Sequence, residues 1–384
     1  MQKKLFLIDA MALIYRAHFA FSKNPRINSK GMNTSAVLGF TNSLLDIINK
    51  EKPTHIGVAY DTHAPTFRHD VFPEYKANRE KQPEDIQIAI PITKELVKAF
   101  NIPVLELDGY EADDIIGTIA KVAASQDFEV FMMTPDKDYA QLVSDNVYLY
   151  KPAYMGNSVD VLGIEEVLKK FDIHHVDQVR DLLGLQGDSV DNIPGIPGVG
   201  AKTAIKFIQE YGSVEELLKN TDKLKGKLKE KVEEFGEQAI LSKELATINT
   251  DVPVPFDAPE FEYSGPDTEK LKPIFDNLEF RTLSRRVFGE QPITSSEDSG
   301  QLSMFGGGKE EDPEQKDAVI KKTISDVKHD YKLIDSDKDI KQLVQKLNKA
   351  SEFCFDTETT GIDAIEAELV GLAFSIKKGE AYYV

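Results

Sequence analysis

Three carboxylate side chains lie within four residues of one another, at Glu111, Asp113 and Asp114, directly before an apolar run. The apolar residues of the segment 115–120 recur at helical spacing, which predicts a buried helix that begins at the acidic stretch. One such residue would be typical of a helix N-terminus, where the helix dipole favours negative charge. Three together repel one another unless a cation lies among them. The pattern therefore predicts a site for a hard divalent cation, Mg²⁺ or Mn²⁺, with oxygen ligands.

Other acidic residues share one property, which is that each follows an apolar run typical of a buried strand. They are Asp9 after residues 5–8, Asp61 after residues 56–60, and Asp136 and Asp138 after residues 130–133. A further pair, Asp188 and Asp191, lies in the segment 187–192. One such residue, Asp138 for example, could simply cap a turn or a helix. The carboxyl ends of parallel strands meet at one sheet edge, however, so several acids there predict a metal-binding acidic pocket.

The size and composition of the chain exclude several classes of protein. Its 384 residues suggest two or three domains. No apolar run approaches the length of a membrane span, and the N-terminal apolar segment is interrupted by Asp9, Arg16 and His18, unlike a signal peptide. The single cysteine, Cys354, excludes an intramolecular disulfide and a cysteine-based zinc cluster, and it is consistent with a reducing cytoplasm.

The formal net charge of the chain is strongly negative, at -19. Taken alone, this charge argues against a nucleic-acid partner. Bound divalent cations would offset part of it, and lysines and arginines are locally dense in the segments 67–81 and 219–231. Local patches rather than totals attract phosphate. For the segment 219–231 a solvated helix face is the interpretation that the sequence favours.

Residues 3–150 alternate apolar strands with helical patterns. Strands are expected at 4–9, 55–60, 104–107, 129–133 and 147–150, and helices at 12–19, 33–48, 83–100 and from the acidic stretch onward. This alternation predicts an α/β fold with a mostly parallel, doubly wound sheet. The connection from Thr62 to about Pro83 is polar, basic and aromatic. It is long for a loop in a compact α/β unit, which suggests a functional role.

After residue 159 the pattern is almost entirely helical. Helices are expected at 163–171, 174–183, 201–211, 214–219 and 236–247. Gly198 and Gly200 directly precede the helix at 201, in a turn whose N–H groups could approach a phosphate, with Lys202 adding a charged contact. Glycine is also typical of plain helix–turn–helix connections. The segment is not a P-loop, because the Gly-Lys-Ser/Thr ending is absent and no strand precedes it.

The C-terminal part of the chain changes character. Residues 290–315 are rich in Ser, Gly, Glu and Gln, which is typical of a flexible acidic linker. From about residue 331 a second α/β pattern begins, and it includes Asp356-Thr357-Glu358-Thr359. The pattern stops after about three strands, too few to bury a good core. We therefore expect the chain to be part of a longer protein.

Together these stretches resemble the 5′-nuclease region of bacterial family A DNA polymerases (DNA polymerase I), in the flap endonuclease superfamily. The matching segments are Leu7-Ile8-Asp9 with Tyr15-Arg16, Tyr60-Asp61, Thr66-Phe67-Arg68, Tyr75-Lys76, Gly109–Ile116, Thr134–Asp138 with Gln141–Val143, and Gly187–Ala204. Asp356-Thr357-Glu358-Thr359 resembles the first motif of that family's 3′–5′ proofreading exonuclease. The later exonuclease motifs and the polymerase domain have no counterpart in the sequence.

The resemblance implies a division of the chain into four parts. A 5′-nuclease catalytic domain of the PIN or flap-endonuclease type would cover residues 1–158, with an arch at about 62–100 through which a 5′ end threads. A helical, DNA-binding helix–hairpin–helix subdomain would cover 159–288. A flexible acidic linker would follow at 289–330, and an incomplete 3′–5′ exonuclease domain at 331–384.

The resemblance also implies roles for individual residues. Metal ligands would be Asp9, Asp61, Glu111, Asp113 and Asp136 at an inner site, with Asp114, Asp138, Asp188 and Asp191 at the remaining acidic positions. Catalytic residues would be Asp113, Asp136, Lys76 and Arg79. DNA-binding residues would be Arg16, Arg68, Tyr75, Lys76, Arg79, Gly195, Gly198, Gly200, Lys202 and Thr203. Tyr75 would stack on a terminal base, although it could instead pack its loop against the body of the protein.

The activity implied is that of a structure-specific 5′–3′ exonuclease or flap endonuclease, which hydrolyses DNA and RNA-primer phosphodiester bonds by a two-metal mechanism. Its cofactors would be two Mg²⁺ or Mn²⁺ ions, with a monovalent cation at the helix–hairpin–helix. Its partner would be nicked or branched duplex DNA with a 5′ flap. It would be a cytoplasmic, nucleoid-associated monomer without membrane contact. A DNA-binding module that does not cut, and a phosphatase for small phosphate esters, remain alternatives.

Overall fold

The computed structural model describes residues 3–152, 158–289, 330–360, 368–377 and 379–384. The chain forms two compact units, Met1–Gly308 and Lys309–Val384, each with its own sheet. The expected acidic linker at 289–330 lies almost entirely outside the described residues, and the expected boundary at residue 158 falls inside the first unit. Across the described ranges, no helix is both long enough and apolar enough to cross a membrane.

In the part of the first unit that the structure describes, the sheet has six strands. Its strands are β1 (Lys3–Asp9), β2 (His55–Ala59), β3 (Val104–Leu105), β4 (Phe128–Met133), β5 (Val147–Lys151) and β6 (Asp160–Leu162). They lie in the order β3-β2-β1-β4-β5-β6, and all neighbours are parallel except β5 and β6. The mostly parallel α/β sheet expected from the alternation is therefore confirmed. The antiparallel edge strand β6 was not expected.

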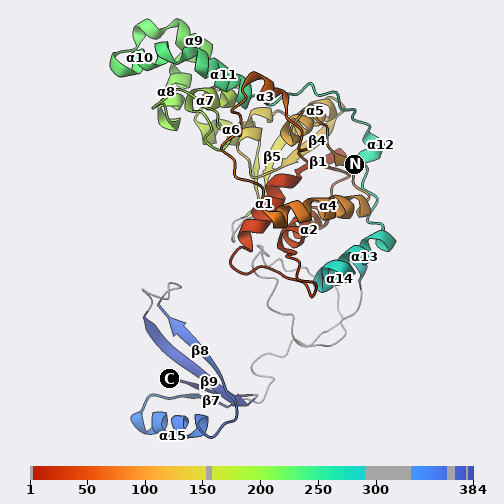
Figure 1. Cartoon of the computed structure of the whole chain (residues 1–384), viewed down its shortest axis with the longest axis vertical. Coiled ribbons are helices and arrows are strands. Elements are labelled where there is room, and N and C mark those ends of the chain that lie inside the picture. The colour runs from red at the N-terminus through yellow and green to blue at the C-terminus, as the bar shows by residue number, and fades with distance from the viewer. Residues whose placement is uncertain (1–2, 153–157, 290–329, 361–367, 378) are drawn as a thin grey trace. The chain divides into compact units, whose positions relative to one another are not determined.

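Helices cover both faces of this sheet (Figure 1). The helices before residue 152 are α1 (Ala10–Ala20), α2 (Ser35–Asp46) with a π-helical extension (Ile47–Glu51), α3 (Phe67–Val71), α4 (Glu84–Ala99) and α5 (Ala112–Ala124). On the central strand, Phe6 and Ile8 pack with α1, α2 and α4. Leu5 and Leu7 pack with α5 and with the helices further along the chain. Successive strand side chains point to opposite faces, so this double burial explains the unbroken apolar run before Asp9.

A helical region follows the sheet and carries the glycine-rich turn of residues 192–201, here called the glycine hairpin. Its helices are α6 (Ile164–Phe171), α7 (Gln178–Gln186), α8 (Ala201–Tyr211), α9 (Val214–Lys219), α10 (Gly226–Glu234) and α11 (Gly236–Ala246). The helices expected at 201–211 and 214–219 are confirmed. The sequence predicted no bounds for α10, although a solvated helix face was the favoured interpretation of residues 219–231, and the mostly charged residues of α10 show only a narrow apolar stripe.

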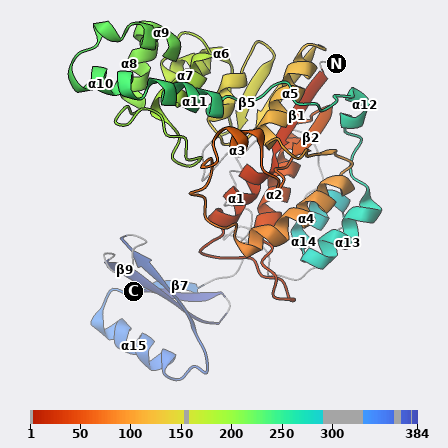
Figure 2. The same cartoon turned by 45° about the horizontal axis from the view of Figure 1, so that its top comes forward.

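The last helices of the first unit return to the sheet. After α12 (Ala258–Phe261), helices α13 (Thr268–Leu278) and α14 (Arg281–Phe288) join the core that contains α2 and α4, where Leu271 and Phe275 are fully buried. Figure 2 shows them beside α4, apart from the group α6–α11. The expectation of one helical subdomain up to residue 288 does not hold for this stretch. The sequence of this stretch shows an apolar stripe, but it does not show which part of the protein covers that stripe.

In the described residues of the second unit there are a four-stranded sheet and one helix. Its elements are β7 (Asp330–Leu333), α15 (Asp337–Leu347), β8 (Cys354–Thr359), β9 (Leu369–Lys377) and β10 (Glu380–Tyr383), with strand order β7-β10-β9-β8. The strand expected near residue 353 is present as β8, and Asp356 and Glu358 are exposed on it. The assignment of residues 331–384 to an incomplete exonuclease domain stays a prediction.

We predict that Phe275→Ala lowers the free energy of unfolding of the first unit by about 3–5 kcal/mol, because truncating a buried aromatic side chain leaves a cavity. Urea unfolding followed by circular dichroism measures the change. Asp276→Ala, at an exposed position of the same helix, is the control and should stay within about 0.5 kcal/mol of the unchanged protein. Equal midpoints for both variants would show that α13 contributes nothing to the core.

Candidate active site

Acidic residues from distant segments line one cavity of about 1120 Å³. The expected metal ligands in its lining are Asp9, Asp61, Glu111, Asp113, Asp136, Asp138, Asp188 and Asp191. Lys76, Arg79 and Lys137 lie among them. The fold therefore brings together the whole set of expected metal ligands except Asp114.

The strand ends position two of these carboxylates. Asp9 is the last residue of β1 and caps α1, because its Oδ1 accepts the N–H of Ala12 at 3.1 Å. Its Oδ2 accepts the hydroxyl of Thr134 at 3.0 Å. Asp61 follows β2, and its Oδ1 accepts the N–H of Ala112, the first residue of α5, at 2.8 Å. Both carboxylates are thus held at helix N-termini next to the sheet edge.

Two cations of the long loop after β2 are paired with acidic residues. Lys76 Nζ lies 2.7 Å from Oε2 of Glu111 and 3.7 Å from Oδ2 of Asp191, and Arg79 also pairs with Asp191. The backbone takes part as well, because the N–H of Lys76 donates to the carbonyl oxygen of Asp191 at 2.9 Å. The loop that was expected to form the arch is therefore docked on the segment that carries Asp188 and Asp191.

Burial and mutual repulsion raise the pKa of several carboxyl groups in the cavity. The pKa of Asp9 is raised to about 7, mainly by burial and then by the negative charge of Asp61. The pKa of Asp138 is raised to about 7 by burial and by Asp136. Burial and its acidic neighbours raise the pKa of Asp113 well above its usual value. The raised pKa values indicate that ionising all the carboxyl groups of the cavity together is unfavourable. A cation among the carboxylates would relieve their repulsion.

The donor set fits hard divalent cations. The acidic side chains of the cavity offer only oxygen ligands, which Mg²⁺ and Mn²⁺ prefer. Oδ1 of Asp138 is buried and has no hydrogen-bond partner among the described residues. Within the same part of the chain, no three acidic, cysteine or histidine side chains are grouped closely enough to hold an ion as they stand. Lys76 and Arg79 neutralise Glu111 and Asp191 in this arrangement, so we infer that ion binding separates those pairs.

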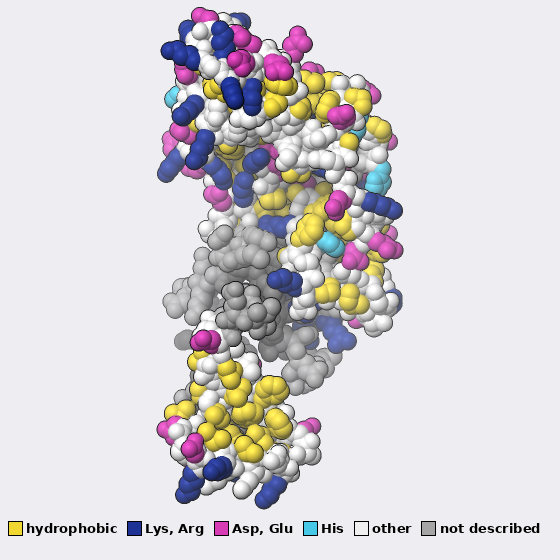
Figure 3. Space-filling model, turned by 60° about the vertical axis from the view of Figure 1, so that its left-hand side comes forward, with side chains coloured by type: hydrophobic (Ala, Val, Ile, Leu, Met, Phe, Trp, Pro, Cys, Tyr) yellow, Lys and Arg dark blue, Asp and Glu magenta, His cyan; other side chains and the backbone are white. Residues whose placement is uncertain are grey.

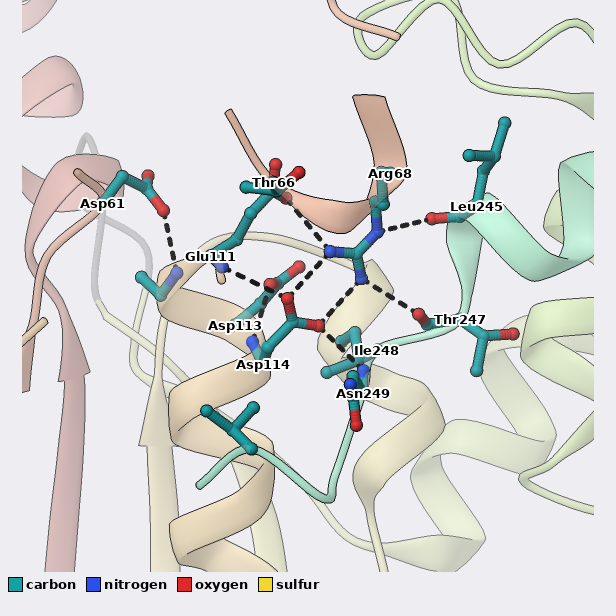
Figure 4. A network of polar contacts seen from close by, with 12 residues as sticks. Asp61, Thr66, Arg68, Glu111, Asp113, Asp114, Leu245, Thr247, Ile248 and Asn249 are labelled. Atoms are coloured by element: carbon teal, nitrogen blue, oxygen red, sulfur yellow. Dashed lines mark hydrogen bonds and ion pairs between the residues drawn. The ribbon is translucent and has the colours of Figure 1, made fainter. Parts of the chain in front are cut away.

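Arg68 and Asp114 form a buried ion pair (Figure 4), and neither residue lines the cavity. Nη1 and Nη2 of Arg68 each lie 2.8 Å from one carboxylate oxygen of Asp114, and the two side chains are 2% and 0% exposed. Arg68 also donates to the carbonyl oxygens of Leu245 and Thr247, and Asp114 accepts the N–H of Asn249. The expectations that Arg68 contacts DNA and that Asp114 binds a metal ion are therefore wrong.

Tyr75 is buried and is not available for stacking. It is 3% exposed, and its hydroxyl donates to Oε2 of Glu111 at 3.1 Å. Its ring meets that of His69 edge to face. Burial and the charges of Glu111 and Asp191 raise the pKa of the Tyr75 hydroxyl. The expected stacking on a terminal base is corrected, and the alternative of packing the loop against the body of the protein is what the structure shows.

Two other expected DNA contacts lie away from the cavity. Arg16 on α1 donates to the carbonyl oxygen of Pro152 at 3.3 Å and borders a separate small cavity. Its role in DNA binding stays a prediction. Gly195 is buried, and its N–H donates to the hydroxyl of Ser242 at 3.0 Å. Gly195 is therefore corrected from a phosphate contact to a structural residue of the hairpin.

The exposed part of the hairpin reaches the rim of the cavity. Gly200 caps α8 and lines the cavity together with Ala201. Gly198 has a φ of +84°, a left-handed backbone conformation that favours glycine. Both glycines and the side chain of Lys202 are exposed, while Thr203 is half-buried. Of these four expected DNA contacts, Gly200 lines the acidic cavity and the others are close to it in the chain. The role of all four in DNA binding stays a prediction.

Sequence reasoning missed two residues of the cavity. Lys137 Nζ lies 3.6 Å from Oδ2 of Asp188, and the buried hydroxyl of Tyr139 donates to Oδ2 of Asp9 at 3.4 Å. The position of Lys137 between Asp136 and Asp138 could have indicated a counter-ion. Nothing in the sequence pattern marks Tyr139, because a buried aromatic residue is most often part of the core.

Family models identify the chain. The model described as "5′-3′ exonuclease, N-terminal resolvase-like domain" matches residues 4–172, and that described as "5′-3′ exonuclease, C-terminal SAM fold" matches residues 174–269. This chain belongs to the 5′–3′ exonuclease family. The family resemblance expected from the motifs is thereby confirmed, and the parallel sheet and the helical region correspond to the two matched parts.

Individual relatives agree with this assignment, and a solved structure shares the fold. The chain is 39% identical to the 5′–3′ exonuclease of Aquifex aeolicus over 285 residues, which cover 74% of this chain and 95% of that protein. It is 45% identical to DNA polymerase I of Bacillus subtilis over 299 residues, 77% of this chain and 33% of the relative. The chain thus spans about a third of the length of that polymerase. A flap endonuclease of bacteriophage T5, solved as a pseudo-enzyme–product complex with DNA and metal ions, matches the fold with a TM-score of 0.54 at 21% identity, over 72% of this chain and 99% of that one.

We predict that Arg68→Ala lowers the free energy of unfolding by about 3–5 kcal/mol, because it leaves the charge of Asp114 buried without a partner. Asp114→Asn should also destabilise, since Arg68 then stays buried without its counter-charge. Thermal and urea unfolding measure both effects. Arg281→Ala, which removes an exposed arginine, is the matched control. If Arg68→Ala were as stable as this control, the ion pair would have no structural role.

Proposed function

We propose that this chain hydrolyses phosphodiester bonds at 5′ ends and 5′ flaps of DNA, and in RNA primers, as the N-terminal part of a DNA polymerase I in the bacterial cytoplasm. The observation that carries the proposal is the single cavity in which carboxylates from distant strand ends and loops gather. Membership of the 5′–3′ exonuclease family supports it. Two Mg²⁺ or Mn²⁺ ions are the cofactors that this donor set suits.

The family resemblance implies two groups of carboxylates. We assign Asp9, Asp61, Glu111, Asp113 and Asp136 to the inner metal site and Asp138, Asp188 and Asp191 to the outer positions. Divalent ions held by these carboxylates would supply an activated water and would stabilise the charge on the attacking and leaving oxygens of a phosphodiester. Hydrogen bonds from Ala12, Thr134 and Ala112 hold two of the inner carboxylates, those of Asp9 and Asp61, in place for that task.

Lys76 and Arg79 are the cations that would act on the scissile phosphate. Their side chains are 18% and 48% exposed in the lining of the cavity. Divalent cations at Glu111 and Asp191 would compete with these two side chains for the carboxylates. Lys76 and Arg79 would then be free to bind the phosphate, which places positive charge where the transition state gains negative charge.

A long polyanion suits the site better than a small phosphate ester. The cavity exceeds the size of a usual small-ligand pocket. The hairpin at its rim offers exposed backbone at Gly198 and Gly200 and the ammonium of Lys202. Nicked or branched duplex DNA could rest its backbone on this hairpin, with or without a monovalent cation, while its 5′ end enters the cavity. We propose a monomer that binds no membrane and is associated with the nucleoid.

A cleavage assay separates this function from its two alternatives. A labelled 5′-flap DNA is incubated with the protein in Mg²⁺ or in EDTA, with a small phosphate ester in parallel. We expect Mg²⁺-dependent release of the flap and no hydrolysis of the ester. Binding without a cleaved product would favour a DNA-binding module, and hydrolysis of the ester alone would favour a phosphatase.

We predict that Asp113→Asn and Asp136→Asn each reduce flap cleavage by about 100-fold or more, because each removes a metal-ligand charge. Mg²⁺ should raise the melting temperature of the unchanged protein and have a smaller effect on these variants. Affinity for DNA in EDTA should not fall, since loss of negative charge cannot weaken attraction to phosphate. Asp145→Asn, at an exposed position outside the cavity, is the control. Binding that decreased in step with cleavage would contradict the assignment.

We predict that Lys202→Ala weakens affinity for duplex DNA and lowers the slope of log affinity against log salt by about one, because one phosphate contact is lost. Fluorescence anisotropy over a range of salt concentrations measures the slope. Lys121→Ala, on the exposed side of α5, should leave it unchanged. An unaltered slope for Lys202→Ala would remove this residue from the contact surface.

A further inference from the structure

Helix α10 and the segment before it form a local positive region in an acidic chain. Residues 219–231 contain six lysines and two acidic residues, whereas the whole chain has a formal net charge of -19. Figure 3 shows lysine and arginine side chains gathered, with acidic ones among them, at the upper end of the first unit, where α8, α9 and α10 lie in Figure 1. A local potential of this kind attracts a polyanion even when the total charge is negative.

The lysines of α10 lie on two different flanks of the helix. Val232 is fully buried and defines the inner side of α10. Lys229 lies on one flank and pairs with Glu233, one turn further along, at 3.6 Å. Lys231 is two positions from Lys229, about 200° around the helix, and therefore lies on the other flank. Lys227 is one turn before Lys231 on that same flank, and its side chain is exposed.

The flank with Lys231 meets the glycine hairpin. Nζ of Lys231 donates to the carbonyl oxygen of Pro197 at 2.8 Å. A Cβ atom added to Gly198 would lie only 2.5 Å from that nitrogen, so the ammonium sits directly against the exposed turn. The carbonyl oxygen is neutral and accepts from only one of the three donors of the ammonium. The charge of Lys229 is balanced by its ion pair with Glu233. Among the ion pairs of the described residues, none balances the charge of Lys231 in this way.

We propose that Lys231, with Lys227 beside it, is a phosphate-binding element that extends the duplex-binding surface of the hairpin from α8 onto α10. The ligand is the sugar–phosphate backbone of duplex DNA, bound without base specificity. The inference rests on the proposed function, because it assumes that the hairpin contacts duplex DNA. The ammonium also occupies the Pro197 carbonyl oxygen, so it supplies at this turn the positive charge that a monovalent cation would otherwise bring.

Charge and continuity favour this surface over a plain solvated helix face. Between Asn192 and Ala201 the hairpin offers backbone N–H groups but no charged side chain, so Lys202, directly after it, is the nearest positively charged residue in the sequence. Neutral donors position a phosphate, whereas the release of counterions by a lysine supplies most of the salt-dependent affinity. Lys231 is the lysine of α10 that reaches the hairpin. Lys229 fits the solvated-face interpretation, which makes it the matched comparison on the same helix.

The test is the salt dependence of binding to a short blunt duplex in EDTA, where cleavage does not interfere. Loss of one phosphate contact should lower the slope of log affinity against log salt by about 0.9, which corresponds to about eightfold weaker binding at 0.1 M salt. We expect this change for Lys231→Ala and for Lys231→Gln. The double variant Lys227→Ala with Lys231→Ala should change the slope by about twice as much. Lys229→Ala and Lys231→Arg should each have a slope close to that of the unchanged protein.

Two results would overturn the inference. One is a slope for Lys231→Gln equal to that of the unchanged protein, and the other is an equal decrease for Lys229→Ala. Flap cleavage by the unchanged protein in Mg²⁺ is measured in parallel. If the unchanged protein cleaves the flap and the slopes do not separate, only this inference fails. If it does not cleave the flap, the proposed function fails, whatever the slopes are.

Discussion

The buried ion pair of Arg68 and Asp114 holds together the segments on which the site depends. Helix α3, the N-terminus of α5 and the chain that follows α11 all meet at this pair. A charge pair in the protein interior is favourable only when its remaining donors and acceptors are also satisfied. The carbonyl oxygens of Leu245 and Thr247 and the N–H of Asn249 meet that condition. The sheet edge with its carboxylates and the helical region with its hairpin are thereby fixed to one another.

Asp113, which precedes Asp114 in the chain, lines the cavity and is in the opposite situation. Asp113 faces like charges, and burial together with those charges raises its pKa. Adjacent residues of a helix point about 100° apart, so one of the two acids enters the framework and the other enters the cavity. Lys76 and Arg79 offset part of the charge there and dock their loop at the same time. The position of this loop and the charge of the site are therefore linked.

The errors of the sequence reasoning share one cause. Arg68, Tyr75 and Asp114 all lie within segments that match the family, and all three are close to the site. A motif indicates that a residue belongs to this region, but not whether its side chain faces a ligand or supports the residues that do. Burial decided the matter, since none of the three is more than 3% exposed. The same reasoning explains α13, whose apolar stripe is evident in the sequence although its partner α4 is not.

The sequence by itself determined the alternation of strands and helices, the parallel sheet, the acidic residues at the strand ends and the glycine turn before α8, because these follow from short-range patterns of apolar, acidic and turn-forming residues. Only the tertiary structure decided which of two neighbouring acids faces the cavity, and that Arg68 is structural. It also decided that Lys231 reaches the hairpin. The physical reason is that burial and ion pairing join residues far apart in the chain, as in the hydrogen bond from Arg68 to Leu245 across 177 positions, and no local pattern records such a meeting.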